Sequence, residues 1–367
     1  MLMFKDLIKN LLSIAGFSIY KTKGIGKIAH QKGNKRLDEK IIERVFDFFN
    51  SIDPFYENID LPEALEIGGA WRVDLIERRK RQLQLIKNRD IESYYDFSRR
   101  MFYNELIKGM WSFSYDYNAK FIHRNFFTDL DNTKKITACS DKKLSFQKDW
   151  DIWGFGTDKG IISYATPKHY VQAYNINNLI SGLNHSTENK IVLDLGSGFG
   201  GMANILADMC KEKLKIVLVD IPLNLATAFT FLSHIYGLQN VFLIKEEKEL
   251  KSVLSNSYDN TSFFLIPTSL IPEYSHHFSS DIVHNAHSFS EMDKISVDFY
   301  MKHLIKEKVS FFLETNSNVS GSVNTGNHIE VLSRDILLPE YFKLLIRYSE
   351  SSYTRYVTSL WSNKLLC

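Results

Sequence analysis

Cysteine and long apolar runs are both scarce in this sequence. It has three cysteines in 367 residues, Cys139, Cys210 and Cys367, and their spacing matches no set of metal ligands. Sparse, scattered cysteine is typical of a reducing compartment. No apolar run approaches the roughly 18–20 residues that a membrane-spanning helix needs, and no small-residue cleavage site follows the apolar residues near the N-terminus. We therefore expect a cytoplasmic protein.

A strong overall charge is missing as well, because the formal net charge is only +2. Residues 1–36 nevertheless carry eight Lys or Arg against one acid. Subtracting this local charge of +7 from the total leaves −5 on the remaining residues. An acidic body argues against a broad nucleic-acid surface, and the sequence has no Asn-Pro-Pro-aromatic motif for a flipped base. We expect no nucleic-acid partner.

The basic segment of residues 1–36 begins with apolar side chains at helical spacing. They are Phe4, Leu7, Ile8, Leu11, Leu12, Ala15 and Ile19. Lys5 and Lys9 lie off this apolar face. Such a helix suits peripheral contact with the inner face of a membrane, where anionic lipids attract basic residues. It equally suits packing on the body or on a partner chain, as in a homo-oligomer, and the sequence leaves both alternatives open.

Residues 37–150 predict a mainly helical region. Apolar residues at helical spacing mark its first helix, at Ile41, Ile42, Val45, Phe46 and Phe49. Longer helices are predicted over residues 71–85 and 91–108, the second ending near Gly109. Residues 121–150 are polar and irregular in pattern, and we expect a loop through residues 129–135.

The most informative stretch is residues 190–222. An apolar run ends in a Gly-rich turn, residues at helical spacing follow, and a second apolar run stops at Asp220. This order predicts strand, loop, helix and strand, and hence a buried parallel sheet. Gly196, Gly198 and Gly200 allow a ligand to lie against the backbone. Asp220 follows the second strand, where a carboxylate can accept the hydroxyls of a ribose.

Several explanations fit these glycines. A dinucleotide site has the spacing G-x-G-x-x-G, whereas the spacing here is G-x-G-x-G. Asp194 stands two residues before the first glycine, where it would repel a phosphate and suit a ligand with a cationic centre. A turn whose glycines only permit close packing of helix on strand is the remaining alternative.

The pattern Asp-x-Gly-x-Gly-x-Gly, with an acid after the next strand, resembles the class I S-adenosylmethionine-dependent methyltransferases. The resemblance implies S-adenosylmethionine as cofactor and a doubly wound, Rossmann-like α/β sheet over residues 151–367. It assigns cofactor contacts to Asp194, Gly196, Ser197, Gly198, Gly200, Asp220, Ile221, Pro267, Thr268 and Asn285. Pro267 and Thr268 depend on whether residues 262–266 or 240–244 form the third strand, which the sequence leaves open.

Three further motifs resemble a narrower group, the sugar O-methyltransferases of polysaccharide-biosynthesis clusters. They are Val219-Asp-Ile-Pro222, Phe264-Leu-Ile-Pro267 and Asn285-Ala-His-Ser-Phe-Ser-Glu-Met292. An upstream helical region with Arg99, Arg100 and Phe102 is similar too, and the resemblance covers roughly residues 70–315. It implies methyl transfer to a hydroxyl of a sugar, a nucleotide sugar or a glycan. Another small-molecule methyltransferase, or a non-catalytic scaffold with the same fold, are the alternatives.

Transfer to an alcohol needs a general base, which we expect at the carboxyl end of a strand. His287, just past the strand, is the first candidate, and His284, which a role within the sheet would also explain, is the second. Glu314 follows. We expect His169 and Tyr170 to line the substrate side, with Tyr164 nearby. Ser288-x-x-Glu291 matches a capping box, and a contact of Glu291 with a substrate hydroxyl is the alternative. The acids are separated in the sequence, so we expect no metal.

Overall fold

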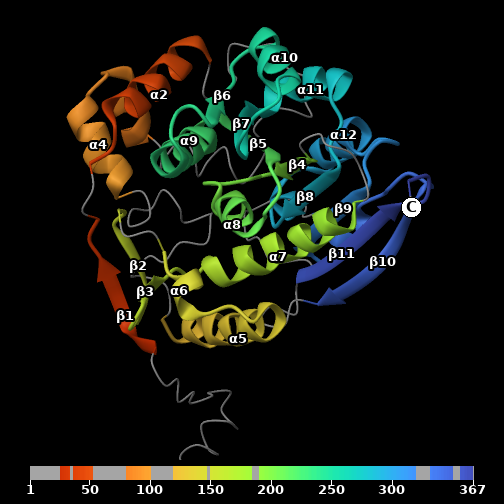
Figure 1. The fold of residues 1–367 in the computed structure, drawn as a ribbon, viewed down its shortest axis with the longest axis horizontal. Coiled ribbons are helices and arrows are strands. Elements are labelled where there is room, and N and C mark those ends of the chain that lie inside the picture. The colour runs from red at the N-terminus through yellow and green to blue at the C-terminus, as the bar shows by residue number, and fades with distance from the viewer. Residues whose placement is uncertain are drawn as a thin grey trace, which may run out of the picture.

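An eight-stranded mixed sheet forms the centre of the molecule (Figure 1). Its strands lie in the order β10 (Phe342–Ser349), β11 (Tyr356–Asn363), β9 (Phe311–Ser317), β8 (Ile282–Ala286), β4 (Lys190–Leu195), β5 (Leu214–Asp220), β7 (Ser262–Pro267) and β6 (Val241–Leu243). The six strands from β9 to β6 are parallel, whereas β11 is antiparallel to both β9 and β10. The computed structural model describes residues 25–33, 36–52, 80–100, 119–146, 149–183, 190–319, 331–349 and 356–366.

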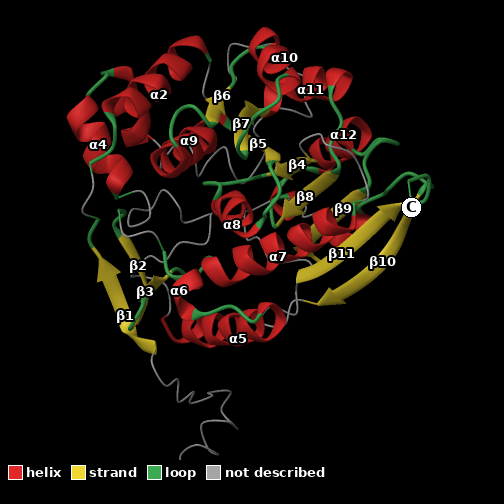
Figure 2. Ribbon diagram, in the orientation of Figure 1, coloured by secondary structure: helices red, strands yellow, loops and turns green. Residues whose placement is uncertain are grey.

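Helices cover both faces of this sheet (Figure 2). One face carries α7 (Thr166–Gly182), α8 (Gly201–Met209) and α9 (Pro222–Tyr236), and the other carries α10 (Glu247–Ser255), α11 (Ile271–His277) and α12 (Lys294–Leu304). Successive residues of a strand point to opposite faces. Ile216 and Leu218 of β5 therefore pack in the first layer, and Val217 and Val219 pack in the second. The predicted doubly wound, Rossmann-like α/β fold is confirmed.

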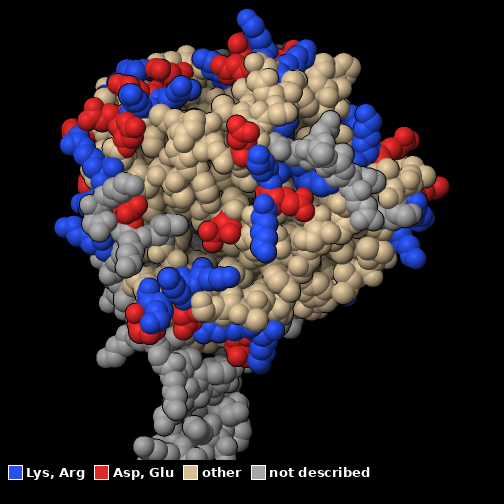
Figure 3. Space-filling model, in the orientation of Figure 1, with Lys and Arg blue, Asp and Glu red and all other residues tan. Residues whose placement is uncertain are grey.

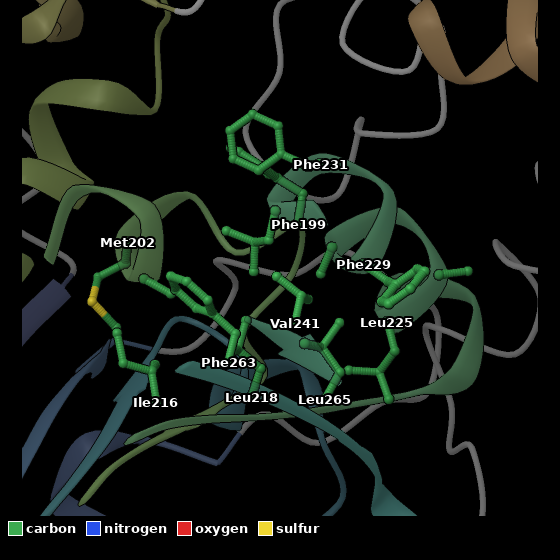
Figure 4. Close-up of a cluster of buried hydrophobic side chains, with 14 of the residues drawn as sticks. Phe199, Met202, Ile216, Leu218, Leu225, Phe229, Phe231, Val241, Phe263 and Leu265 are labelled. Atoms are coloured by element: carbon green, nitrogen blue, oxygen red, sulfur yellow. The ribbon is translucent and has the colours of Figure 1, made fainter. Parts of the chain in front are cut away.

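The first layer contains a dense apolar cluster (Figure 4). Met202 of α8, Phe229 of α9 and Phe263 of β7 are at most 3% exposed. Burying an apolar side chain of this size stabilises a protein by roughly 1.5–3 kcal/mol. Phe199 and Phe231 join the cluster with ring centres 5.4 Å apart. The loop that follows β4 is therefore anchored by its own aromatic side chain to α9.

The N-terminal region packs on this same layer. Its described helices are α2 (Glu39–Ser51), residues 80–87, α4 (Ile91–Arg99), α5 (Ala119–Thr137) and α6 (Asp141–Leu144). Asp38 and Asp90 cap α2 and α4 by accepting backbone N–H groups of Lys40 and Ser93. Helix α2 lies against α9, and α5 lies against α7. Among the described residues, no helix is long and apolar enough to cross a bilayer.

Two predictions for this region are wrong. Helix α5 runs through residues 129–135, where we expected a loop. Its buried positions Phe126, Leu130 and Thr133 are spaced four and three apart, and the Thr133 hydroxyl donates to the carbonyls of Asp129 and Pro167. Helix α4 ends at Arg99 rather than near Lys108. The predicted helix of residues 1–19 lies outside the described residues.

A small antiparallel sheet was not predicted. It consists of β1 (Ile25–Gln31), β2 (Ile152–Thr157) and β3 (Gly160–Ile162), in that order. Strand β1 comes from the segment that we expected to be a basic amphipathic extension, and it pairs with β2 more than 100 residues later. A Cβ at Gly154 would lie 2.4 Å from the carbonyl oxygen of Ile162, so glycine permits the close pairing of β2 with β3.

The strand order also resolves the question of the third strand. Strand β7 lies beside β5, and β6 occupies the outer edge. The chain leaves β4 toward β5 and returns on the other side of β4 as β8. The crevice outside the carboxyl ends of the strands at such a reversal is the usual ligand site of an open α/β sheet.

Candidate functional site

A cavity of about 150 Å³ lies at this reversal of strand order. Residues that end β4, β5 and β8 form its floor, and side chains from α7 and from the start of α12 form its walls. Of the predicted site residues, those that line it are Asp194, Gly196, Ser197, Gly198, Asp220, Ile221, Thr268, His284, His287, His169 and Glu291. Cofactor, base and substrate candidates thus share one cavity.

The glycines of the loop after β4 have different roles. All three have positive φ, 69° at Gly196, 57° at Gly198 and 80° at Gly200. A Cβ at Gly196 would lie 2.2 Å from the Ser288 hydroxyl, so this glycine allows β4 and the end of β8 to meet. Gly200 packs against Leu232 and caps α8 without lining the cavity. Only Gly196 and Gly198 present bare backbone to a ligand.

The Asp220 carboxylate is held at the end of β5 by three donors. The backbone N–H of Gly198 donates at 2.7 Å, that of Ile221 at 2.8 Å, and the Asn224 amide at 2.9 Å. Burial nevertheless raises the pKa of Asp220 to about 6. Sequence reasoning missed Asn224. Its position four residues after Asp220, in the first turn of a helix, was the available signal.

His284 and Asp194 form a buried pair on neighbouring strands. Their register in β8 and β4 is direct, and His284 Nδ1 lies 2.7 Å from Asp194 Oδ1. An ionised carboxylate can only accept, so Nδ1 carries the proton and Nε2 holds the lone pair. His284 Nε2 is buried and has no hydrogen-bond partner among the described residues. The sequence left open whether His284 is a base or a satisfied histidine within the sheet, and among the described residues only one of its nitrogens is bonded.

Two more histidines and a lysine stand beside this pair. His287 has φ of 66° and sets its ring edge-on against Tyr356, with centres 4.5 Å apart. Burial, with the charge of Lys168 next in importance, holds the pKa of His287 well below its usual value. Burial also lowers the pKa of His169 to about 4. Both rings are therefore neutral at physiological pH.

The Ser288-x-x-Glu291 pattern is not a capping box. The Ser288 hydroxyl accepts from the Asn285 amide at 2.5 Å and lies 3.3 Å from the Leu195 carbonyl oxygen, to which it donates. Helix α12 begins later, at Lys294. Ser288 instead connects the turn that follows β8 to the end of the neighbouring strand β4. Glu291 lines the cavity.

Asn285 connects this turn to β9 without lining the cavity. Its amide oxygen accepts from Asn316 at 2.9 Å, and Asn316 also donates to Glu314 at 3.0 Å. Glu314 is 1% exposed and accepts from the Ser333 hydroxyl at 2.5 Å. The predicted base candidate Glu314 therefore lies inside the sheet, away from the cavity.

The other predicted residues outside the lining belong to the core. Tyr164 and Tyr170 pack with Phe126 and Phe155 between α5, α7 and β2. Pro267 ends β7 beside Asp220, but only the following Thr268 reaches the cavity.

Lining residues that the sequence did not single out include Lys168, Gln172, Asn224 and Tyr300. Among the residues described here, no group of three or more His, Cys, Asp or Glu is placed to hold a metal ion.

Comparisons with known proteins give only distant likenesses. No family model matches the sequence, and no curated protein matches it. Three of the similar solved structures are methyltransferases. The small RNA methyltransferase HEN1 is 13% identical over 53% of this chain and 25% of its own, with a TM-score of 0.36. ChlM of Synechocystis PCC 6803, a magnesium protoporphyrin IX methyltransferase with bound SAH, is 12% identical over 66% of this chain and 98% of its own, with a TM-score of 0.34.

The third is the mitomycin 7-O-methyltransferase MmcR, which is 9% identical over 55% of this chain and 56% of its own, with a TM-score of 0.30. The chain thus spans about a quarter of HEN1 and about half of MmcR. Similarities this weak do not support a functional assignment. The function is therefore inferred from the strand order and from the residues of the cavity.

Proposed function

We propose that the protein is an S-adenosylmethionine-dependent O-methyltransferase that acts on a sugar hydroxyl. The observation that carries the proposal is the common cavity of Asp220 and the His284–Asp194 pair. The first can hold a ribose and the second can take a proton. The sugar acceptor is supported by the Asn285 to Met292 motif, which resembles the sugar O-methyltransferases.

The residues of the cavity fit S-adenosylmethionine. Gly196 and Gly198 leave backbone exposed to a ligand, and Asp220 Oδ2 accepts only one bond among the described residues. Asp194 uses Oδ1 for His284, and no described hydrogen bond occupies its Oδ2. Two carboxylates would repel the pyrophosphate of a dinucleotide, whereas they attract a ligand with cationic centres. When bound, S-adenosylmethionine supplies a methyl group that its sulfonium makes reactive.

We assign the role of general base to His284. Asp194 fixes its tautomer and stabilises the imidazolium that forms when Nε2 takes the hydroxyl proton. A positioned base of this kind contributes roughly 10²- to 10⁴-fold in rate. His287, the first candidate from the sequence, is held at a low pKa by burial and by Lys168, which makes it a poorer proton acceptor. Asp220 and the glycine loop orient the reactants, which is the other large contribution.

The surface charge on one face argues against a nucleic-acid acceptor. On the face seen in Figure 3, the Lys and Arg of the described residues are interspersed with Asp and Glu. Binding to a nucleic-acid backbone draws instead on a continuous basic surface.

The first experiment is calorimetric titration with S-adenosylmethionine and with its demethylated product. We expect micromolar binding to the intact protein and loss of binding in Asp220→Ala. Asp259→Ala, which removes a fully exposed carboxylate, is the matched control and should bind normally. A folded protein that binds neither ligand would contradict the proposal and favour a non-catalytic scaffold.

The second experiment tests the base. With a nucleotide sugar or glycan accepted by the wild type, His284→Gln should lower turnover by roughly 10²- to 10⁴-fold while cofactor affinity stays unchanged. His287→Gln should retain most of the activity. The reverse result would return the role of base to His287. Full activity in both variants would favour an acceptor that needs no strong base.

A further inference from the structure

Helix α7 brings a cation and an amide to one wall of the cavity. Lys168 and Gln172 lie four residues apart, on the same face of the helix. They are 7% and 5% exposed, and both line the cavity. Long polar side chains are rarely buried to this degree without a specific role.

The Gln172 amide has an unused donor. Its Nε2 is buried and has no hydrogen-bond partner among the described residues. A buried donor that stays unsatisfied destabilises the folded protein, so such groups mark places where a ligand completes the bonding. The group that suits an ammonium and an amide N–H side by side is an anionic acceptor with two oxygens.

The charge of Lys168 favours a negative charge at this wall. His169 and His287 flank Lys168, and the lysine charge contributes to the low pKa of both rings. Lys168 Nζ lies 6.0 Å from the ring centre of Tyr356 at the start of β11. In the sheet, β9, β8 and β4 separate β11 from β5, which ends at Asp220. An anion here would be attracted by Lys168 and would meet neutral imidazoles.

The same two side chains line a second cavity, of about 190 Å³, between α5, α7 and the strands β9, β10 and β11. Its lining includes amide and hydroxyl side chains, among them those of Asn132, Asn175, Thr315 and Thr358. Amide, hydroxyl and carboxylate groups are those that hydrogen-bond the hydroxyls of a sugar. Lys168 and Gln172 therefore line both the cofactor cavity and this second cavity.

We propose that Lys168 and Gln172 form a carboxylate-binding subsite, an inference that rests on the proposed function. The carboxylate has two sources, the acid group of a uronic-acid acceptor and the amino-acid end of the cofactor. In either case the ammonium and the amide N–H donate to its two oxygens and fix the ligand beside His284.

The test compares Lys168→Met and Gln172→Leu with the wild type. Calorimetry first compares SAH, the demethylated cofactor, with 5′-methylthioadenosine, which lacks the amino-acid end. Glucuronate and glucose are then titrated with SAH present. Galacturonate and mannuronate extend the acidic panel. Lys168→Arg keeps the cation, and Asn178→Leu changes an exposed amide of the same helix as the matched control.

If the acceptor supplies the carboxylate, a uronate binds at least tenfold more weakly to Lys168→Met, Lys168→Arg restores binding, and SAH affinity is unchanged. If the cofactor supplies it, SAH binds at least tenfold more weakly while 5′-methylthioadenosine binds as before. The subsite is overturned if SAH binds Lys168→Met within twofold of the wild type and no uronate distinguishes the two proteins.

Failure of the proposed function gives a different result, because then neither SAH nor 5′-methylthioadenosine binds the wild type. Folding of the variants is checked by thermal unfolding.

Discussion

At the scale of single residues, the raised pKa of Asp220 predicts how cofactor binding depends on pH. Burial sets this pKa at about 6, so the carboxylate is ionised at pH 7.5 and protonated below pH 6. Ribose hydroxyls donate to the ionised form, and binding must therefore weaken as the pH falls through 6. We expect the dissociation constant for SAH to rise toward tenfold per pH unit between pH 6 and pH 5.

Calorimetry between pH 5 and 8 measures this slope. Asp194 and His284 face the same cavity, so the slope is assigned with Asp220→Asn, which should bind weakly and lose the pH dependence. A wild-type affinity that stays constant from pH 8 to pH 5 would refute this role of Asp220.

The backbone of His287 gives a second prediction at this scale. Its φ of 66° is unfavourable for a residue with a Cβ, by roughly 1–2 kcal/mol. Both His287→Ala and His287→Gly remove the contact with Tyr356, but only glycine relieves the strain. We expect the Gly variant to be more stable than the Ala variant by about 1 kcal/mol in urea unfolding. Equal stabilities would show that the turn relaxes once the imidazole is removed.

At the scale of elements, the polar chain between β8 and β9 predicts a stability effect that depends on pH. Burial raises the pKa of Glu314, and the Ser333 hydroxyl, which donates to it, is the strongest opposing influence. A carboxyl with a raised pKa in the folded state favours folding less as the pH rises through that pKa. Ser333→Ala should raise the pKa further and destabilise the protein by roughly 1–3 kcal/mol at pH 8.

The loss should be smaller at pH 5, because a larger share of Glu314 is then protonated. Urea unfolding at the two pH values measures the difference, and Ser333→Ala in a Glu314→Gln background is the control, where the pH dependence should vanish. A loss that is equal at both pH values would show that the serine acts only through packing.

Some of these elements could be predicted from the sequence and others could not. Strands β4 and β5 and helix α8 were predictable because apolar runs and glycines mark their ends within one continuous stretch. Helix α5 was missed because its exposed face is rich in charge, with Lys135 paired to Asp131, and this polar face resembles a loop. Strand β1 was missed because its partner β2 lies more than 100 residues away.

The same limit applies to the site. Asp194, Asp220 and the glycines belong to one local motif, so their meeting was foreseeable. The pairing of Asp194 with His284 depends on β4 lying directly beside β8, and the contribution of Lys168 depends on α7 lying over that edge. Neither of these contacts between elements can be predicted from the spacing of residues within one segment. The ranking of His287 above His284 followed from strand position alone, without this pairing.

At the scale of the whole molecule, the N-terminal helices and the sheet share one core. Tyr94 of α4 packs edge-on against Phe46 of α2, with ring centres 5.3 Å apart, and both belong to the cluster that contains α9. Trp150, which precedes β2, packs against Phe231 of α9 with ring centres 5.7 Å apart. Helix α9 begins directly after Asp220, at Pro222. The segment that covers α9 therefore supports the helix whose Asn224 donates to the Asp220 carboxylate.

A shared core predicts that ligand binding at Asp220 stabilises α2 as much as the sheet. Free SAH at 100 times its dissociation constant should stabilise the folded state by about 2.7 kcal/mol. Amides that exchange only through global unfolding should then exchange about 100-fold more slowly, in α2 as well as in β4. Native-state hydrogen exchange with and without SAH measures this. Slowing confined to β4 and β5 would mean that α2 opens independently, because a helix that unfolds alone gains nothing from a ligand bound at the sheet.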